Sequence, residues 1–173
     1  RYQLSSHTFG AAFIFRGESP RYDNLFLQPQ YNNRAIDNPE LTLGTSAELT
    51  YSYTAPRFNL HTALYIASTM REVDVVRYYD DLSSEYVDAV VSGIGRLHYG
   101  IEARADVDWS RLFSSSFALN VGQYLYHKDP TVTTYADDDN TLITKSISKM
   151  RGHHTGAPEI DFYGDIAFRH KRS

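Results

Sequence analysis

The sequence predicts an all-β protein in which about six long strands form an antiparallel up-and-down meander. Three observations predict this fold. Apolar and polar residues alternate in six separate stretches. Tyr and Phe, which favour strands, are abundant with 14 and 9 copies. The connections between the stretches also alternate between short and long. No stretch shows the period of an α-helix.

The alternation has the period of two that a strand with differing faces requires. Its clearest example runs from Leu97 to Trp109, where an apolar residue at every second position is separated by polar, charged or small ones. The predicted strands are roughly 9–13 residues long, against about 5–6 residues in soluble proteins and about 9–11 in outer-membrane barrels. The six alternating stretches cover 9–15, 47–53, 58–66, 97–109, 117–125 and 162–168.

The connections indicate where the two ends of each strand lie. The second and third strands are joined by the tight turn 55–57, and the fourth and fifth by the short link 110–116. The other connections are long and span 17–43, 67–96 and 128–160. Outer-membrane barrels have short periplasmic turns and long extracellular loops, and long loops are uncommon in compact soluble domains. We therefore expect part of a larger transmembrane β-barrel.

The long connection at 67–96 has a strand pattern of its own. Residues 73–79 and 86–91 alternate, and the segment 80–84 between them has turn composition. This pattern predicts a hairpin that extends the sheet beyond the membrane.

In such a barrel one face of each strand meets lipid and the other meets a wet lumen. Aromatic residues near both strand ends predict girdles at the two membrane interfaces, although Tyr and Phe are also simply good strand formers. The polar positions predict a lumen lining whose charges pair across strands, or alternatively contact a solute or a plug. The girdle candidates are Phe15, Tyr53, Phe58, Tyr99, Trp109, Phe117 and Phe162. The lumen candidates are Glu48, His98, Glu102, Arg104, Asp106, Asp108, Asp165 and Arg169.

Composition excludes several other classes. The mean hydropathy of -0.45 and the absence of a long apolar run exclude a helical membrane protein, which needs about 20 apolar residues per span. A net charge of -4 without a basic stripe argues against nucleic-acid binding. No nucleophile or phosphate-binding motif is present, so we expect no enzyme activity and no cofactor. The run Asp137, Asp138 and Asp139 is a candidate calcium site, with a solvated acidic loop tip as the alternative.

Several ordered motifs resemble those of one membrane-protein family. The stretches 38–41 and 46–53 read Asn-Pro-Glu-Leu and Ser-Ala-Glu-Leu-Thr-Tyr-Ser-Tyr, and they resemble an "NPxL…xEL.Y.Y" segment of TonB-dependent receptor barrels. Residues 93–102 resemble the "G…GxE" entry into the following strand. Residues 121–130 resemble a later strand and its exit, and Gly156-Ala157-Pro158 resembles the "G.P" before the next one.

This resemblance implies that residues 1–173 are a partial barrel domain, an internal segment of a barrel of the twenty-two-stranded type. It implies outer-membrane uptake of a scarce solute, such as a siderophore, glycan or peptide, in a Gram-negative bacterium. The implied partners are outer-membrane lipid, a plug domain of the same parent chain, the TonB complex through a missing N-terminal part and, in some such receptors, a surface lipoprotein. The resemblance implies that the plug, the TonB box and the barrel ends lie outside this segment.

Solute contact is expected from aromatic side chains in the long connections, which offer flat amphipathic surfaces. Two other functions stay open at this stage. One is a passive porin-like channel. The other is a soluble all-β ligand-binding module, which would bury the apolar face against a second layer. The four aromatic candidates are Tyr78, Tyr79, Tyr86 and Tyr135.

Overall fold

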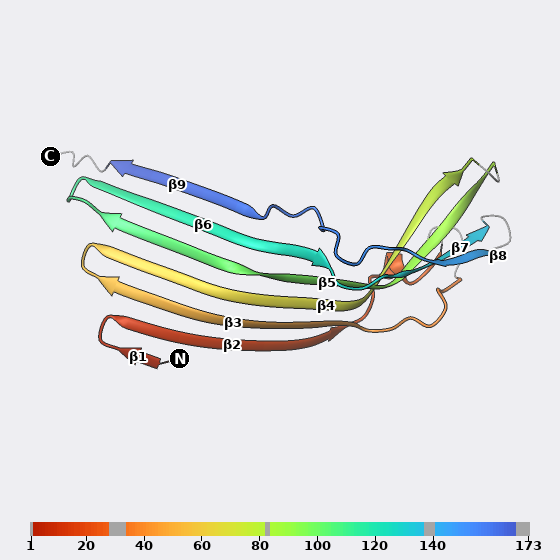
Figure 1. The fold of residues 1–173 in the computed structure, drawn as a ribbon, viewed down its shortest axis with the longest axis horizontal. Coiled ribbons are helices and arrows are strands. Elements are labelled where there is room, and N and C mark those ends of the chain that lie inside the picture. The colour runs from red at the N-terminus through yellow and green to blue at the C-terminus, as the bar shows by residue number, and fades with distance from the viewer. Residues whose placement is uncertain (1, 28–33, 82–83, 137–140, 169–173) are drawn as a thin grey trace.

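The computed structural model describes residues 2–27, 34–81, 84–136 and 141–168. These residues form one antiparallel sheet of nine strands and a single short 3-10 helix (Figure 1). Nothing helical in these ranges is long and apolar enough to cross a membrane. The elements are β1 (Tyr2–Leu4), β2 (His7–Glu18), η1 (Tyr22–Asn24), β3 (Thr42–Ala55), β4 (Phe58–Asp80), β5 (Glu85–Asp108), β6 (Phe113–Tyr126), β7 (Thr131–Ala136), β8 (Leu142–Ile147) and β9 (Ile160–Phe168).

The sheet is an open meander. Its strands follow one another in the order β1-β2-β3-β4-β5-β6-β9, and every neighbouring pair is antiparallel. The two ends of this order do not meet, so the sheet is not closed. The predicted all-β meander and its six long strands are confirmed. The strands bend at one end, as described in a later paragraph. The part of the sheet between the tight turns and this bend is called the wall.

Two regions differ from the prediction. The short strand β1 forms a hairpin with β2 and was not expected. The connection 128–160 is also not a plain loop, because β7 pairs with residues 87–92 of β5 and β8 pairs with β7. Since β6 and β7 share β5 as a neighbour, they behave as one long strand interrupted at 127–130. Their short, mostly polar sequences carry too little alternation to reveal this.

The longest strands bend sharply where the wall ends. β4 and β5 have 23 and 24 residues, and their pairing shifts register between Thr69 and Val73. At this bend Arg71 has φ 62 and Gly93 has φ 78. A left-handed backbone costs a residue such as Arg about 1–2 kcal/mol and costs Gly almost nothing. Beyond the bend the predicted hairpin of 73–79 and 86–91 is confirmed, and it leaves the direction of the wall (Figure 1).

Beyond the bend lies a small packed lobe, formed by the β4–β5 hairpin, β7, β8 and the connection from β2 to β3. Its hydrophobic cluster joins Leu27 and Ile36 of that connection to Val90 and Tyr135 of the sheet. The Asn24 side chain also donates a hydrogen bond of 2.8 Å to the carbonyl of Val73. The lobe therefore has a core, whereas the wall is a single layer.

The register of the wall is held by a tyrosine that lies over two glycines. Tyr65 faces Gly100 across the β4–β5 pair, and Gly100 faces Gly122 across the β5–β6 pair. The Tyr65 hydroxyl lies 2.8 Å from that of Tyr124. A Cβ at Gly100 would lie 2.5 Å from the Val121 carbonyl oxygen and 2.7 Å from the Tyr65 hydroxyl. Backbone and ring fill the space that a larger residue needs.

We therefore predict that Gly100→Ala destabilises the protein by about 1–3 kcal/mol, because the methyl group overpacks against backbone. Gly164→Ala is the matched control, since its Cβ would meet no atom closer than 3.6 Å. Removing this glycine should change stability by less than about 1 kcal/mol. Thermal unfolding in detergent measures both variants. Equal losses of stability at the two positions would contradict the proposed role of the contact between Tyr65 and Gly100.

Candidate functional site

The register brings the predicted apolar residues of all six strands onto one face. Residues paired across an antiparallel sheet point to the same side. A single row crosses the wall through Ala11, Leu49, Leu64, Ile101, Val121 and Ile160. The neighbouring row passes through Phe9, Tyr51, Thr62, Ala103, Leu119 and Phe162. The expected division into an apolar and a polar face is confirmed.

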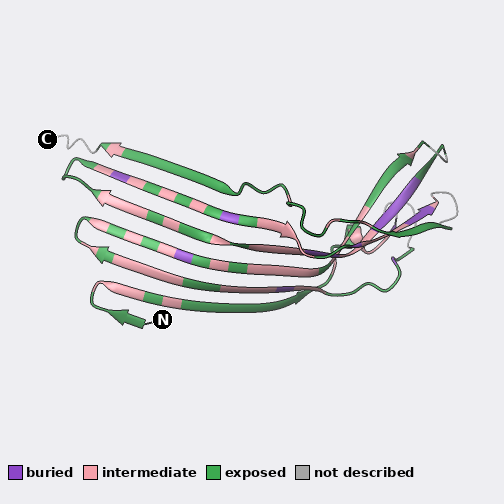
Figure 2. Ribbon diagram, viewed as in Figure 1, coloured by how far each residue is buried: buried purple, intermediate pink, exposed green. Residues whose placement is uncertain are grey.

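The apolar face is uncovered. Leu49, Leu64 and Phe162 lie in the middle of the wall and are 60%, 54% and 66% exposed. Along β6, from Phe117 to Gln123, exposed residues of this side alternate with more buried residues of the other side (Figure 2). No segment of the described chain packs over these side chains, as a soluble sandwich would require. Soluble monomers rarely leave an apolar surface of this extent open, and such surfaces mark contact with a membrane or a protein.

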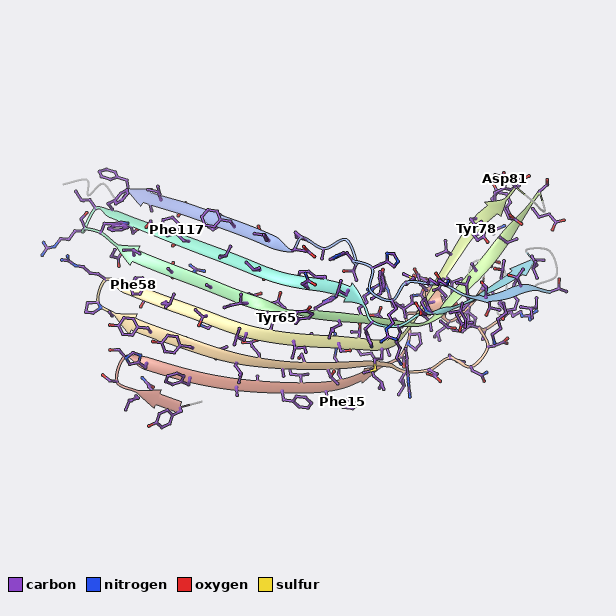
Figure 3. All side chains as sticks on the ribbon, viewed as in Figure 1. Phe15, Phe58, Tyr65, Tyr78, Asp81 and Phe117 are labelled. Atoms are coloured by element: carbon purple, nitrogen blue, oxygen red, sulfur yellow. The ribbon has the colours of Figure 1, made fainter. Side chains whose placement is uncertain are left out.

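Several girdle candidates gather at the turn end of this face. Phe58 and Phe117 lie near the tight turns, and Phe15 lies towards the opposite end of the wall (Figure 3). The rings of Tyr53 and Phe58 are 6.2 Å apart. Trp109 is 59% exposed, and its indole N–H donates a hydrogen bond of 2.8 Å to Ser115 Oγ.

The candidates at the opposite end do not share one row. Phe15 aligns with Leu97 of β5 through the paired strands, whereas Phe162 aligns with Ala103. Tyr99 lies between these two levels. The three aromatic positions therefore follow a slanted line across the wall.

The predicted lumen residues within the described ranges share the opposite, polar face. They are Glu48, His98, Glu102, Arg104, Asp106, Asp108 and Asp165. Arg169 lies outside the described residues. Charge pairing across strands was expected, but Arg104 pairs along its own strand, with Asp106 at 3.2 Å. This happens because residues two apart on a strand share a face. The contact across strands is a hydrogen bond of 2.6 Å that Ser116 donates to Asp106.

The polar face also holds a hydroxyl cluster that the sequence did not reveal. Tyr65 donates a hydrogen bond of 3.2 Å to Asn120 Oδ1, and the Asn120 amide donates one of 3.0 Å to the Tyr124 hydroxyl. Ser52 Oγ and His61 Nδ1 lie 2.8 Å apart on the same face. The available signal was the presence of Tyr and His at polar positions of the alternation. The wall thus presents hydrogen-bonding groups on one side and hydrocarbon on the other.

Three of the four aromatic contact candidates lie together at the tip of the lobe hairpin. Tyr78, Tyr79 and Tyr86 are 44%, 50% and 53% exposed, and Figure 3 shows Tyr78 near the tip. The Tyr79 and Tyr86 rings meet edge to face at 5.3 Å. The Arg77 guanidinium lies 5.1 Å from the Tyr86 ring centre. Tyr79 and Tyr86 thus form an exposed aromatic surface with one cation against it, whereas Tyr78, the neighbour of Tyr79 on β4, points to the opposite face of the hairpin.

Tyr135 lies elsewhere, and its contact with a solute stays a prediction. It is only 4% exposed and belongs to the lobe core. Its hydroxyl donates a hydrogen bond of 3.0 Å to Asp37, and the Arg34 guanidinium lies 5.5 Å from its ring centre. Burial and then this hydrogen bond raise the pKa of Tyr135. Its role in the structure is to fasten the β2–β3 connection to the sheet.

A cavity of about 460 Å³ opens beside this core, and sequence reasoning did not locate it. It lies between the segment 34–40 and one face of β4, β5, β7 and β8. Among its lining residues are Arg34, Asp37, Glu40, Arg71, Thr133 and Lys145. Only the tertiary fold brings these positions together, and no local pattern marks them.

No cluster of acidic or histidine side chains in the described ranges is arranged to hold a metal ion. The calcium candidates Asp137, Asp138 and Asp139 lie outside those ranges. Comparison of the chain with protein-family models, with curated proteins and with solved structures finds no match.

Proposed function

We propose that this chain forms part of the wall of a transmembrane β-barrel in the outer membrane of a Gram-negative bacterium. We further propose that the barrel is a TonB-dependent receptor that imports a scarce solute. The observation that carries the first proposal is the wall itself. It is a single sheet layer, apolar and uncovered on one face and polar on the other.

Such a layer suits a boundary between hydrocarbon and water. Backbone groups inside a membrane need internal hydrogen-bond partners, and a closed barrel is the only sheet that supplies them. β9 pairs with β6 alone among the described strands, and the short β1 leaves most of β2 open on its outer side. Further strands at these edges would complete the closed wall.

The positions of the turns support a tilted barrel wall. The β1–β2 turn ends at His7. Followed across the paired strands, His7 lies level with Ala105 of β5. The second hairpin end at Phe58 aligns with Val107, and the third lies at Asp108 itself. The turns thus advance three residues over four inter-strand steps. With about 3.3 Å per residue and about 4.8 Å between strands, this slope is about 27°. Barrel strands tilt by about 35–45°, a little more than this.

The spacing of aromatic residues supports a membrane-sized band. Tyr99 and Trp109 lie on the apolar face, ten residues apart along β5 and just beyond it. At about 3.3 Å per residue this is about 33 Å along the strand, or about 29 Å after correction for the slope. The hydrocarbon core of a bilayer is about 30 Å thick, and barrels carry aromatic girdles at its two borders. The remainder of β4 and β5 would then project outside.

Import energised by TonB is supported by the order of the motifs and by the difference in structure between the two ends of the wall. Short turns close one end, whereas the other end carries the whole lobe (Figure 1). Barrels of the resembled family enclose a plug, and the polar face offers the hydrogen-bonding surface that a plug contact needs. The lobe would then lie on the extracellular side.

We predict that Ile101→Arg lowers the amount of folded protein in the outer membrane. An arginine on the lipid face costs about 2–4 kcal/mol at mid-membrane. Glu102→Arg is the matched control, because this neighbouring residue faces the polar side. It should change stability by less than about 0.5 kcal/mol. Protease resistance of outer-membrane fractions measures both. Equal folding of the two variants would sink the membrane proposal.

A second measurement separates the receptor from a passive channel. The protein containing this wall, reconstituted in planar lipid bilayers, should show no steady ion conductance, because a plug fills the lumen of large transporter barrels. A stable open conductance would instead identify a porin-like channel, while leaving the membrane wall itself intact.

A further inference from the structure

The lobe cavity has the size and construction of a small-molecule site. Its volume of about 460 Å³ falls within the range of about 300–1,000 Å³ that ligand pockets occupy. Its floor is a regular sheet face, since Val90 faces Thr133 and Thr133 faces Lys145 across paired strands. The segment 34–40 forms the opposite side. One connection and four strands therefore contribute to it.

The lining is richer in positive charge than the rest of the chain. Arg34, Arg71 and Lys145 line the cavity together with two carboxylates, although the chain as a whole carries a net charge of -4. Both carboxylates already have partners. Glu40 lies 3.3 Å from Arg71 Nε, and Asp37 accepts the hydrogen bond of Tyr135. With three cations against two carboxylates, the lining keeps one net positive charge, which favours an anionic ligand.

The uncharged lining groups favour a ligand with hydroxyls rather than an aromatic or apolar one. Ser92, Thr131 and Thr133 place hydroxyl groups along the cavity. Tyr135 is the aromatic residue of the lining, and its buried ring leaves no flat surface for stacking. A neutral sugar would therefore lack a stacking platform, and a carboxylate would gain the charge of the lining.

Three residues with a left-handed backbone line the same cavity. Asn38, Arg71 and Gly93 have φ values of 51, 62 and 78, and all three line it. Non-glycine residues in this conformation are uncommon and gather at ligand sites and switch regions. The bend of the wall and the cavity therefore depend on the same two left-handed strand positions, Arg71 and Gly93.

We infer that the lobe cavity binds a sugar acid of one or two rings. Its carboxylate is held by Lys145, and its hydroxyls are held by Thr131 and Thr133. This inference concerns the lobe alone and does not depend on whether the wall spans a membrane. Ion-pair recognition also means that added salt weakens the binding.

The test uses the whole protein in detergent micelles, which cover the apolar face whatever its natural partner is. Calorimetric titration with D-galacturonate should show saturable binding, and D-galactose should bind at least about tenfold more weakly. Lys145→Gln should weaken galacturonate binding about fivefold, the size of one partly exposed ion pair. Lys149→Gln is the matched control, because this exposed lysine lies four residues further on and outside the cavity lining.

Three results would overturn the inference: no saturable binding of galacturonate, equal binding of galactose, or equal effects of Lys145→Gln and Lys149→Gln. Lys145→Arg restores the positive charge and should restore binding, which separates lost recognition from lost folding. Failure here leaves the Ile101→Arg test untouched, so the two proposals stand or fall separately.

Discussion

A sheet that is one layer thick gives every side chain in the wall only two possible surroundings. Neighbouring residues on a strand point to opposite sides, and paired residues on adjacent strands share a side. A shift of one residue in any strand would therefore carry its apolar side chains to the polar face. The contact of Tyr65 with Gly100 and Gly122 opposes such a shift on three strands at once. The rest of the structure depends on this division of the side chains between an apolar and a polar face.

The lobe depends on the wall through the bend at Arg71 and Gly93. The two strands that cross the middle of the wall continue past the bend and form the sheet of the lobe. The lobe is stabilised differently, because the β2–β3 connection covers one of its faces and buries Leu27 and Ile36. Within one sheet the chain thus builds an uncovered layer and a packed domain-like end, and the cavity of about 460 Å³ lies at the packed end.

Period-two patterning was sufficient to predict the wall, because the alternation within each strand's own sequence separates its two faces. The hairpin of 73–79 and 86–91 was predictable for the same reason. β7 and β8 were not, since six-residue strands carry little pattern. The burial of Tyr135 was not predictable, because it depends on Asp37, which lies 98 residues away in the sequence. The cavity depends on contacts of this distant kind, so no local pattern could have located it.

The most direct test of the account compares the surroundings of the two faces. The chain has no cysteine, so single cysteines at Leu64 and Ile101, and at Ala63 and Glu102, can each carry one nitroxide label. These positions form adjacent cross-strand pairs on opposite faces. In lipid bilayers, power saturation should show the first pair exposed to oxygen and shielded from a water-soluble nickel chelate, and the second pair the reverse. Shielding of Leu64 and Ile101 from both reagents would show that protein covers this face, and would contradict the account.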